Sequence, residues 1–126
     1  MESRRKRVLI AEDNPALSRV LEFNLTKGGF DATVAPNGLV AWQHATKEHF
    51  DAIITDQQMP EMTGVELCQQ IRSLPRYEKT PIVMLTAKYL EMELPKIRDE
   101  LNLSATFPKP FSPQRVVHEV QQLLVV

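Results

Sequence analysis

Apolar residues along this chain gather in short runs, separated by longer segments in which they recur every three or four positions. The short runs are rich in valine and isoleucine, which is typical of strands buried on both faces of a sheet. The longer segments have the spacing of amphipathic helices. The expected strands are Val8–Ala11, Asp31–Ala35, Ala52–Thr55, Ile82–Leu85 and Ala105–Phe107.

Capping residues place the helices between these strands. Asn14 before Pro15 and Ser112 before Pro113 predict two helix starts, because a polar cap followed by proline suits a first turn. Three further helices are expected to begin at Gly38, Gly64 and Leu94, the last two ending at Leu74 and Leu101. The helical residues expected to face the core are Leu17, Val20, Leu21, Leu25, Leu39, Trp42, Ala45, Leu67, Ile71, Leu74, Val116, Val117, Val120 and Leu124.

Strands and helices alternate five times along the 126 residues. Such alternation predicts an α/β fold, in which a parallel sheet lies between two layers of helices joined by right-handed crossovers. The length suits one domain, so we expect residues 1–126 to form a single unit, with residues 1–7 as a basic, solvated lead-in. The segment Pro75–Pro81 is expected to be a polar connection.

Composition and charge narrow the class of protein. The net charge is −1, from 15 basic and 16 acidic residues, which favours neither nucleic acid nor an anionic membrane as a partner. Cys68 is the only cysteine, which excludes an internal disulfide, and we expect it to be a small packing residue. No apolar run approaches the length of a membrane span. We therefore expect a cytoplasmic domain that binds neither nucleic acid nor membrane directly.

Polar side chains follow four of the expected strands at the point where each strand ends. Glu12 and Asp13 follow the first strand, Asp56 the third, Thr86 the fourth and Lys109 the fifth. Because the carboxyl ends of parallel strands meet at one edge of a sheet, these residues should share a small basin. Three carboxylates there would repel one another unless a cation lay between them, and Mg²⁺ accepts carboxylates, waters and phosphate oxygens. The set therefore suits phosphoryl transfer with a carboxylate as nucleophile.

These residues form a pattern that resembles the receiver domain of two-component response regulators, over essentially the whole chain. The matching stretches are Glu12-Asp13, Asp56-x-x-Met59-Pro60-x-Met62-x-Gly64, Thr86-Ala87 and Lys109-Pro110-Phe111. The resemblance implies a flavodoxin-like (βα)5 three-layer sandwich, whose five parallel strands lie in the order 2-1-3-4-5. It also implies a cis peptide bond between Lys109 and Pro110.

The resemblance further assigns the acidic residues to a metal site and a phosphoacceptor. By analogy, Asp13, Asp56 and the backbone carbonyl of Gln58 hold Mg²⁺, for which Mn²⁺ could substitute. Glu12 would reach the ion through water. Asp56 would accept a phosphoryl group from a phosphohistidine, carried by a sensor histidine kinase or a histidine phosphotransfer protein.

Signalling would follow from that phosphorylation. Thr86 and Lys109 would contact the phosphoryl oxygens, and the resulting switch in conformation would be read by an output partner or output domain. The protein is expected to be a monomer or a phosphorylation-dependent dimer. On this interpretation the chain is a signalling module rather than an enzyme, and catalyses only its own phosphorylation and dephosphorylation.

Near the fifth strand the sequence departs from the family pattern. Thr106 stands where the family usually has an aromatic residue, and strand alternation should send the ring of Phe107 to the opposite face, into the core. Pro108 cannot donate a strand hydrogen bond, which an edge strand tolerates. In the family this aromatic side chain swings inward on phosphorylation, and Thr106 is too small to do the same. We therefore expect the loop Thr86–Leu94, ahead of Pro95, to change conformation instead.

Two other functions compete with the phosphoacceptor interpretation. A small phosphatase or phosphotransferase with an aspartate nucleophile usually needs a second acid two residues later, where this chain has Gln58. A pseudo-receiver would bind its partners without phosphate, but nothing structural would then require the acids, the threonine and the lysine together.

Overall fold

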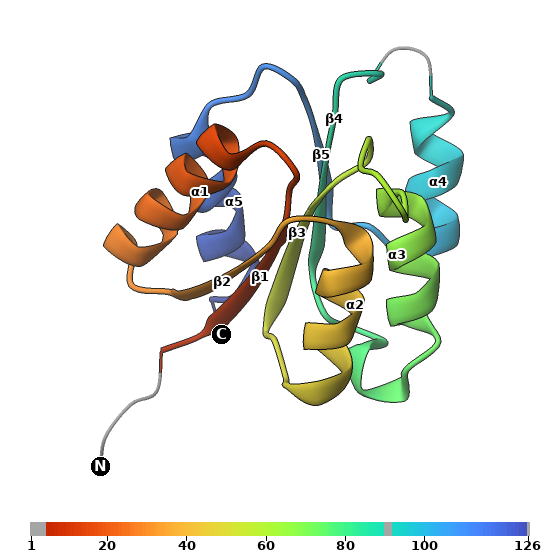
Figure 1. Ribbon diagram of the computed structural model, residues 1–126, viewed down its shortest axis with the longest axis horizontal. Coiled ribbons are helices and arrows are strands. Elements are labelled where there is room, and N and C mark those ends of the chain that lie inside the picture. Colours follow the sequence, from red (N-terminus) through yellow and green to blue (C-terminus); the bar gives the residue numbers. More distant parts are fainter. Residues whose placement is uncertain (1–4, 90–91, 126) are drawn as a thin grey trace.

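The computed structural model describes residues 5–89 and 92–125, which contain a five-stranded parallel sheet (Figure 1). The strand order is β2-β1-β3-β4-β5, as the resemblance implied. Every expected strand is present with the predicted bounds or one residue more. The strands are β1 (Arg7–Ala11), β2 (Asp31–Ala35), β3 (Ala52–Asp56), β4 (Ile82–Thr86) and β5 (Ala105–Pro108).

Helices cover both faces of this sheet. Helices α1 and α5 lie on one face, and α2, α3 and α4 lie on the other (Figure 1). The helices are α1 (Pro15–Lys27), α2 (Gly38–Lys47), α3 (Gly64–Arg72), α4 (Leu94–Leu101) and α5 (Pro113–Leu123), with a short 3-10 helix η1 at Pro75–Tyr77. The three-layer, flavodoxin-like α/β fold is thereby confirmed.

Alternation along the strands divides the core in two. Leu9 and Ile53 pack on the side of α2 and α3, whereas their neighbours Ile10 and Ile54 pack on the side of α1 and α5. All four side chains are fully buried, as is Cys68 in α3. Burial raises the pKa of the Cys68 thiol to about 12, so this cysteine is a packing residue, as expected.

The two predicted helix caps are confirmed. Asn14 Oδ1 accepts the N–H of Ala16 at 2.9 Å, and Pro15 follows as the first residue of α1. At α5, Ser112 Oγ accepts the N–H of Arg115 at 3.3 Å. Each cap satisfies a backbone donor that would otherwise lack a partner in the first turn.

Several helical residues are less buried than periodicity predicted. Val20 and Leu39 are 42% and 41% exposed, while the smaller Ser18 is buried in α1. Leu74 and Leu124 lie just beyond the ends of α3 and α5 and are half-buried. Periodicity identifies the apolar side of a helix, but the width of the buried stripe depends on the neighbours that pack against it.

Two segments are more structured than expected. Arg7 is the first residue of β1 rather than part of a solvated lead-in, because its guanidinium pairs with Glu48 and lies 4.7 Å from the ring centroid of Phe50. The connection Pro75–Pro81 is not simply polar either. Tyr77 in η1 is fully buried, and its hydroxyl donates to the carbonyl of Glu48 at 2.8 Å. Both contacts join residues far apart in sequence.

The edge strand β5 presents its side chains to opposite faces, as predicted. Thr106 lines a groove of about 660 Å³ beside α4, whereas Phe107 packs against the core under α1 and α5. Phe107 is only half-buried, so the expectation that its ring lies within the core is correct in direction but too strong. Pro108 occupies the edge position that tolerates a missing donor.

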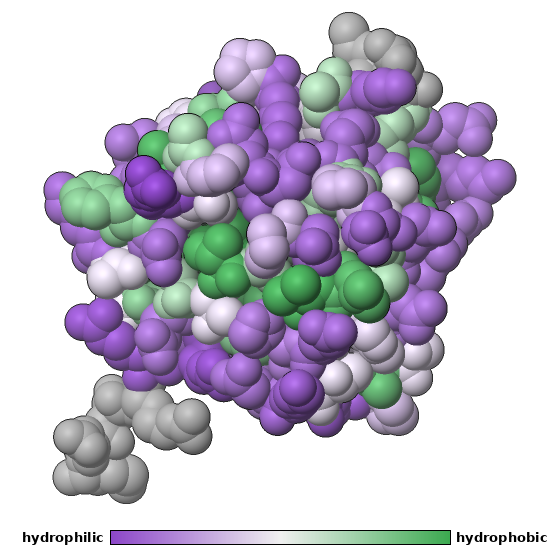
Figure 2. Space-filling model, in the orientation of Figure 1, coloured by the Kyte–Doolittle hydropathy of each residue, from purple (hydrophilic) through white to green (hydrophobic). Residues whose placement is uncertain are grey.

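The surface carries both polar and apolar side chains. Figure 2 shows polar side chains over most of one face, with apolar ones in separate patches. Among the described residues, the large apolar side chains that are exposed are those of Val20, Phe23, Leu39 and Val125. Within residues 5–89 and 92–125, none of the helices combines the length and apolar character needed to cross a membrane.

Candidate functional site

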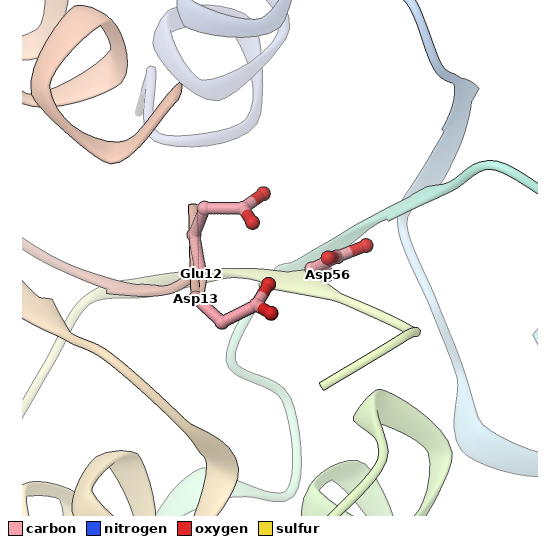
Figure 3. Close-up of side chains that lie close together, drawn as sticks. All are labelled: Glu12, Asp13 and Asp56. Atoms are coloured by element: carbon pink, nitrogen blue, oxygen red, sulfur yellow. The ribbon is translucent and has the colours of Figure 1, made fainter. Parts of the chain in front are cut away.

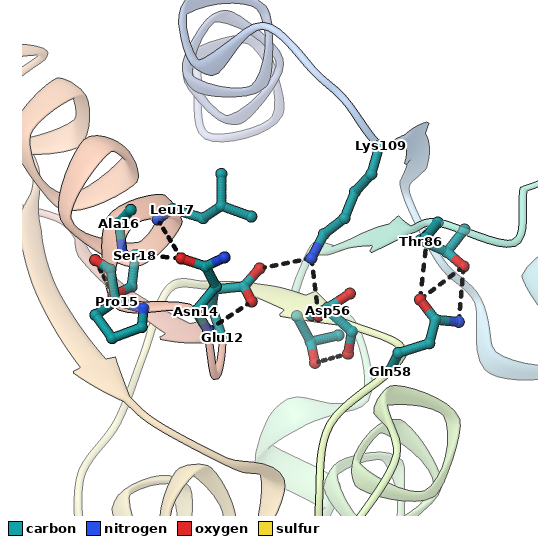
Figure 4. A network of polar contacts seen from close by, with 12 residues as sticks. Glu12, Asn14, Pro15, Ala16, Leu17, Ser18, Asp56, Gln58, Thr86 and Lys109 are labelled. Carbon is teal, nitrogen blue, oxygen red and sulfur yellow. Dashed lines mark hydrogen bonds and ion pairs between the residues drawn. The ribbon is translucent and has the colours of Figure 1, made fainter.

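The carboxyl ends of four strands meet at one edge of the sheet and bring the predicted residues together (Figure 4). Glu12 and Asp13 follow β1, Asp56 ends β3, Thr86 ends β4 and Lys109 follows β5. In the order 2-1-3-4-5 the chain reverses its direction across the sheet between β1 and β3. Such a switch point leaves a crevice outside the strand ends, where ligands bind in open α/β sheets.

Three carboxylates form the negative part of this basin (Figure 3). Glu12, Asp13 and Asp56 each contribute an oxygen, and these oxygens lie within 4.8 Å of one another. Glu12 and Asp56 are each 1% exposed, whereas Asp13 is open to solvent. Burial raises the pKa of the Glu12 carboxyl, and the negative charge of Asp56 raises it further. The N–H of Asn14, which donates to Glu12 Oε2 at 3.1 Å, lowers this pKa but does not cancel the rise.

Lys109 supplies the positive charge of the basin. Its Nζ lies 2.9 Å from Asp56 Oδ2 and 3.1 Å from Glu12 Oε1, and its side chain is 18% exposed. Burial alone would lower the pKa of this ammonium, but hydrogen bonding to Asp56 and Glu12 outweighs burial and raises it. Lys109 therefore stays charged between two buried carboxylates. The peptide bond that follows it, Lys109–Pro110, is cis as predicted.

Two buried carboxylate oxygens accept no hydrogen bond from the described part of the chain. They are Asp56 Oδ1, which has no polar partner there, and Glu12 Oε1, whose one partner is the ammonium of Lys109 at 3.1 Å. A buried oxygen without a partner is costly, and a cation would satisfy it. The donors are all carboxylate oxygens, which suit a hard cation such as Mg²⁺ better than a metal that prefers nitrogen or sulfur. The residues present thus fit the metal that the resemblance implies.

The loop after β3 folds back tightly onto Asp56. A Cβ atom at Gly64 would lie 2.3 Å from the carbonyl oxygen of Asp56, so only glycine fits at this position. The Gly64 N–H donates to the carbonyl of Gln57 at 3.0 Å. Helix α3 then starts with a capping box between Thr63 and Glu66, which sequence analysis missed although its T-x-x-E spacing was visible.

The side chain of Gln58 has partners that the sequence did not reveal. Its Nε2 donates to Thr86 Oγ1 at 3.0 Å, and its Oε1 accepts the N–H of Ala87 at 3.1 Å (Figure 4). The place of the Gln58 backbone carbonyl in a metal site stays a prediction. No local pattern encodes where a loop side chain points, because that depends on which strand end lies beside it.

Comparison with known proteins decides the family. The family model described as the response regulator receiver domain matches residues 8–121. The chain belongs to the response regulator receiver family. Its acidic cluster of Glu12, Asp13 and Asp56 is consistent with the Mg²⁺ and aspartate phosphorylation site of that family.

Similarity to individual proteins supports the same family assignment. It is 34% identical over 120 residues to the alkaline phosphatase synthesis transcriptional regulatory protein PhoP of Bacillus subtilis, covering 94% of this chain and 48% of PhoP. The chemotaxis response regulator CheY4 of Vibrio cholerae has a similar structure, with a TM-score of 0.87 and 30% identity, covering 96% of this chain and 100% of CheY4.

A third comparison bears on the metal. The receiver domain of the sensor histidine kinase PA1611 from Pseudomonas aeruginosa carries a magnesium ion coordinated in its active-site cleft. Its TM-score to this receiver domain is 0.83 at 26% identity, covering 95% of this chain and 98% of that one. This receiver domain spans about half the length of PhoP and of other transcriptional regulators that it matches. Receiver domains are signalling modules, and response regulators interact with histidine kinases and output domains.

Proposed function

We propose that this receiver domain accepts a phosphoryl group on Asp56 and thereby switches between two signalling states. The observation that carries the proposal is the difference in contacts between the two oxygens of the Asp56 carboxylate. Its Oδ2 is held by Lys109 Nζ at 2.9 Å, while its Oδ1 is buried and accepts no hydrogen bond from the described residues. A carboxylate with one oxygen held and the other free of hydrogen bonds is oriented to act as a nucleophile.

The donor would be a phosphohistidine of a sensor histidine kinase or of a histidine phosphotransfer protein. An oxygen of Asp56 attacks phosphorus and forms an O–P bond while the P–N bond breaks. The electron pair leaves with the imidazole, which takes up a proton from solvent. Lys109 and the hydroxyl of Thr86 bind phosphoryl oxygens, because phosphoryl transfer depends mainly on positioning and on neutralising negative charge.

The proposed metal ligands are Asp13, Asp56 and the backbone carbonyl of Gln58, with Glu12 acting through water. When bound, Mg²⁺, or Mn²⁺ in its place, supplies positive charge to the carboxylates and to the phosphoryl oxygens. Two observations support this assignment: the oxygen-only cluster, and the magnesium ion in the similar PA1611 receiver domain.

The proposal extends to the context of the domain. We take residues 1–126 as a single receiver domain in the cytoplasm, which signals to an output partner or output domain and does not itself contact nucleic acid. It acts as a monomer or a phosphorylation-dependent dimer. Its chemistry is confined to its own phosphorylation and dephosphorylation, because the basin is built around a single acceptor, Asp56.

Labelling with acetyl phosphate tests the assignment. Intact-mass measurement should find one added phosphoryl group on the wild-type domain in Mg²⁺ and none in EDTA. Asp56→Asn should remain unlabelled, whereas Asp31→Asn, an exposed acid at the start of β2, should label like the wild type. Equal labelling of Asp56→Asn would contradict the assignment. A folded wild-type domain that is never labelled would instead favour the pseudo-receiver.

A further inference from the structure

The carboxamide of Gln58 covers the polar end of β4. Its Oε1 accepts the N–H of Ala87 at 3.1 Å and lies 3.3 Å from Thr86 Oγ1, to which Nε2 donates at 3.0 Å (Figure 4). Thr86 is fully buried. A single side chain therefore occupies both the hydroxyl at the end of β4 and the backbone N–H that follows it.

The hydrogen-bonding capacity of Thr86 is already filled. A hydroxyl has one hydrogen to donate and two lone pairs. The lone pairs accept the N–H of Lys88 at 3.0 Å and the Nε2–H of Gln58 at 3.0 Å. The hydrogen has two acceptors within reach, Gln58 Oε1 and Met92 Sδ, each at 3.3 Å. A further oxygen can therefore take the N–H of Ala87 only in place of the Gln58 oxygen, and the hydrogen of Thr86 only in place of Gln58 Oε1 or Met92 Sδ.

The surroundings of Gln58 allow it to leave. The residue is half-buried and lies in the loop after β3, two positions beyond Asp56. It borders an open cavity of about 450 Å³ that is also lined by Asp13 and Lys88. Its carboxamide can swing into this space without opening a cavity in the core, and water can then satisfy it.

The neighbouring glutamine provides a contrast. Gln57 Oε1 accepts the N–H of Val65 at 2.8 Å and so fastens the loop to the first turn of α3. That contact satisfies a helix terminus and touches no group at the end of β4. The two adjacent amides thus differ in their partners, and only Gln58 holds groups that face the basin.

We propose that the Gln58 carboxamide is a latch, which holds Thr86 and Ala87 in the unphosphorylated protein and is displaced when a phosphoryl oxygen on Asp56 takes these donors. The inference rests on the proposed function and deepens it. Hydrogen bonds to an anionic oxygen are roughly twice as strong as those to a neutral amide, so the exchange favours the phosphorylated form. Gln58 is then a positioning residue that sets the threshold of the switch through Thr86.

Beryllofluoride, a non-covalent mimic of the phosphoryl group, gives a direct test. Wild type, Gln58→Met and Gln57→Met would be titrated with beryllofluoride in Mg²⁺ while the backbone amides of Ala87 and Lys88 are followed by NMR. Gln58→Met keeps the length of the side chain but removes its donor and acceptor. We expect half-saturation at a beryllofluoride concentration about fivefold lower than for wild type, as loss of a competing hydrogen bond implies. Gln57→Met should saturate like the wild type.

A second measurement needs no beryllofluoride. Without beryllofluoride, the Ala87 amide should exchange its hydrogen with solvent faster in Gln58→Met than in wild type. In Gln57→Met, the exchange rate of the Ala87 amide relative to those of adjacent amides should be the same as in wild type. Gln58→Ala should repeat both results if methionine packs poorly. Equal or weaker binding by the Gln58 variants, or an unchanged Ala87 amide, would overturn the latch while leaving the phosphoacceptor intact. If the wild-type domain does not bind beryllofluoride, this would instead overturn the proposed function, and the latch with it.

Discussion

The Nζ of Lys109 lies 2.9 Å from Oδ2 of Asp56, although the two residues are 53 positions apart in the sequence. The contact reaches from the edge strand β5 to β3 across the end of β4. The same Nζ lies 3.1 Å from Glu12 Oε1, so a single ammonium bridges two buried carboxylates. The electrostatic balance of the basin therefore depends on Lys109 and on any cation bound beside it.

Lys109→Ala should lower the free energy of unfolding by about 2 kcal/mol at pH 7 in EDTA, because it leaves Glu12 and Asp56 facing each other without a positive partner. Mg²⁺ should restore part of that loss. Urea unfolding in EDTA and in Mg²⁺ measures both. Lys96→Ala, which removes an exposed pair with Glu100 at 3.9 Å, is the control and should change stability by about 0.5 kcal/mol or less. A similar small change for Lys109→Ala would contradict this account of the basin.

Mg²⁺ should raise the Tm of the wild-type domain. A ligand at 100 times its Kd stabilises a protein by about 2.7 kcal/mol, which corresponds to a rise of roughly 10 °C for a domain of this size. Asp13→Asn removes the exposed member of the acidic cluster and should abolish most of that rise. Asp31→Asn, at the opposite end of the strands, should retain it. An undiminished rise in Asp13→Asn would exclude Asp13 as a ligand.

The loop after β4, predicted from sequence to carry the switch, is tied directly to Thr86. Thr86 Oγ1 accepts the N–H of Lys88 at 3.0 Å and lies 3.3 Å from Met92 Sδ. Movement of this hydroxyl toward a phosphoryl group would break both contacts. Residues 90 and 91 of the expected loop lie outside the described residues.

We therefore expect beryllofluoride to change amide exchange at Lys88 and Met92 and to leave Thr106 nearly unchanged. Hydrogen exchange of the free and beryllofluoride-bound forms, in Mg²⁺, measures this. Thr106 lines the groove beside α4 and has no hydrogen bond through its side chain among the described residues that would link it to Thr86. Changes confined to β5, with the loop after β4 unaffected, would show that the switch lies elsewhere.

Gly64→Ala should destabilise the domain by about 3 kcal/mol and impair labelling of Asp56. The added Cβ would lie 2.3 Å from the Asp56 carbonyl oxygen, so the loop and the end of β3 must separate. Gly29→Ala is the control, since Gly29 has a φ of +97° but no atom within 4 Å of the added Cβ. It should cost about 1 kcal/mol of backbone strain and label normally. Chemical unfolding and acetyl phosphate labelling of both variants distinguish the two effects.

The sequence by itself determined the order and type of the five strands and the five α-helices. Helix α4 was predicted at Leu94–Leu101 from its pattern and from Pro95, and the structure has the same bounds. Such signals act within one or two turns of chain, so they can be read locally. The sequence also indicated which residues would meet, because parallel strands necessarily bring Asp56, Thr86 and Lys109 to the same edge of the sheet.

Only the tertiary structure decided the partners of individual side chains. It turned the Gln58 amide toward Thr86, drew Arg7 into a pair with Glu48, and buried Ser18 while leaving Val20 exposed. Each outcome depends on which surface of another element lies within a few ångströms. That distance is set by packing between residues far apart in the chain, whereas periodicity and capping report only on residues that are close in sequence.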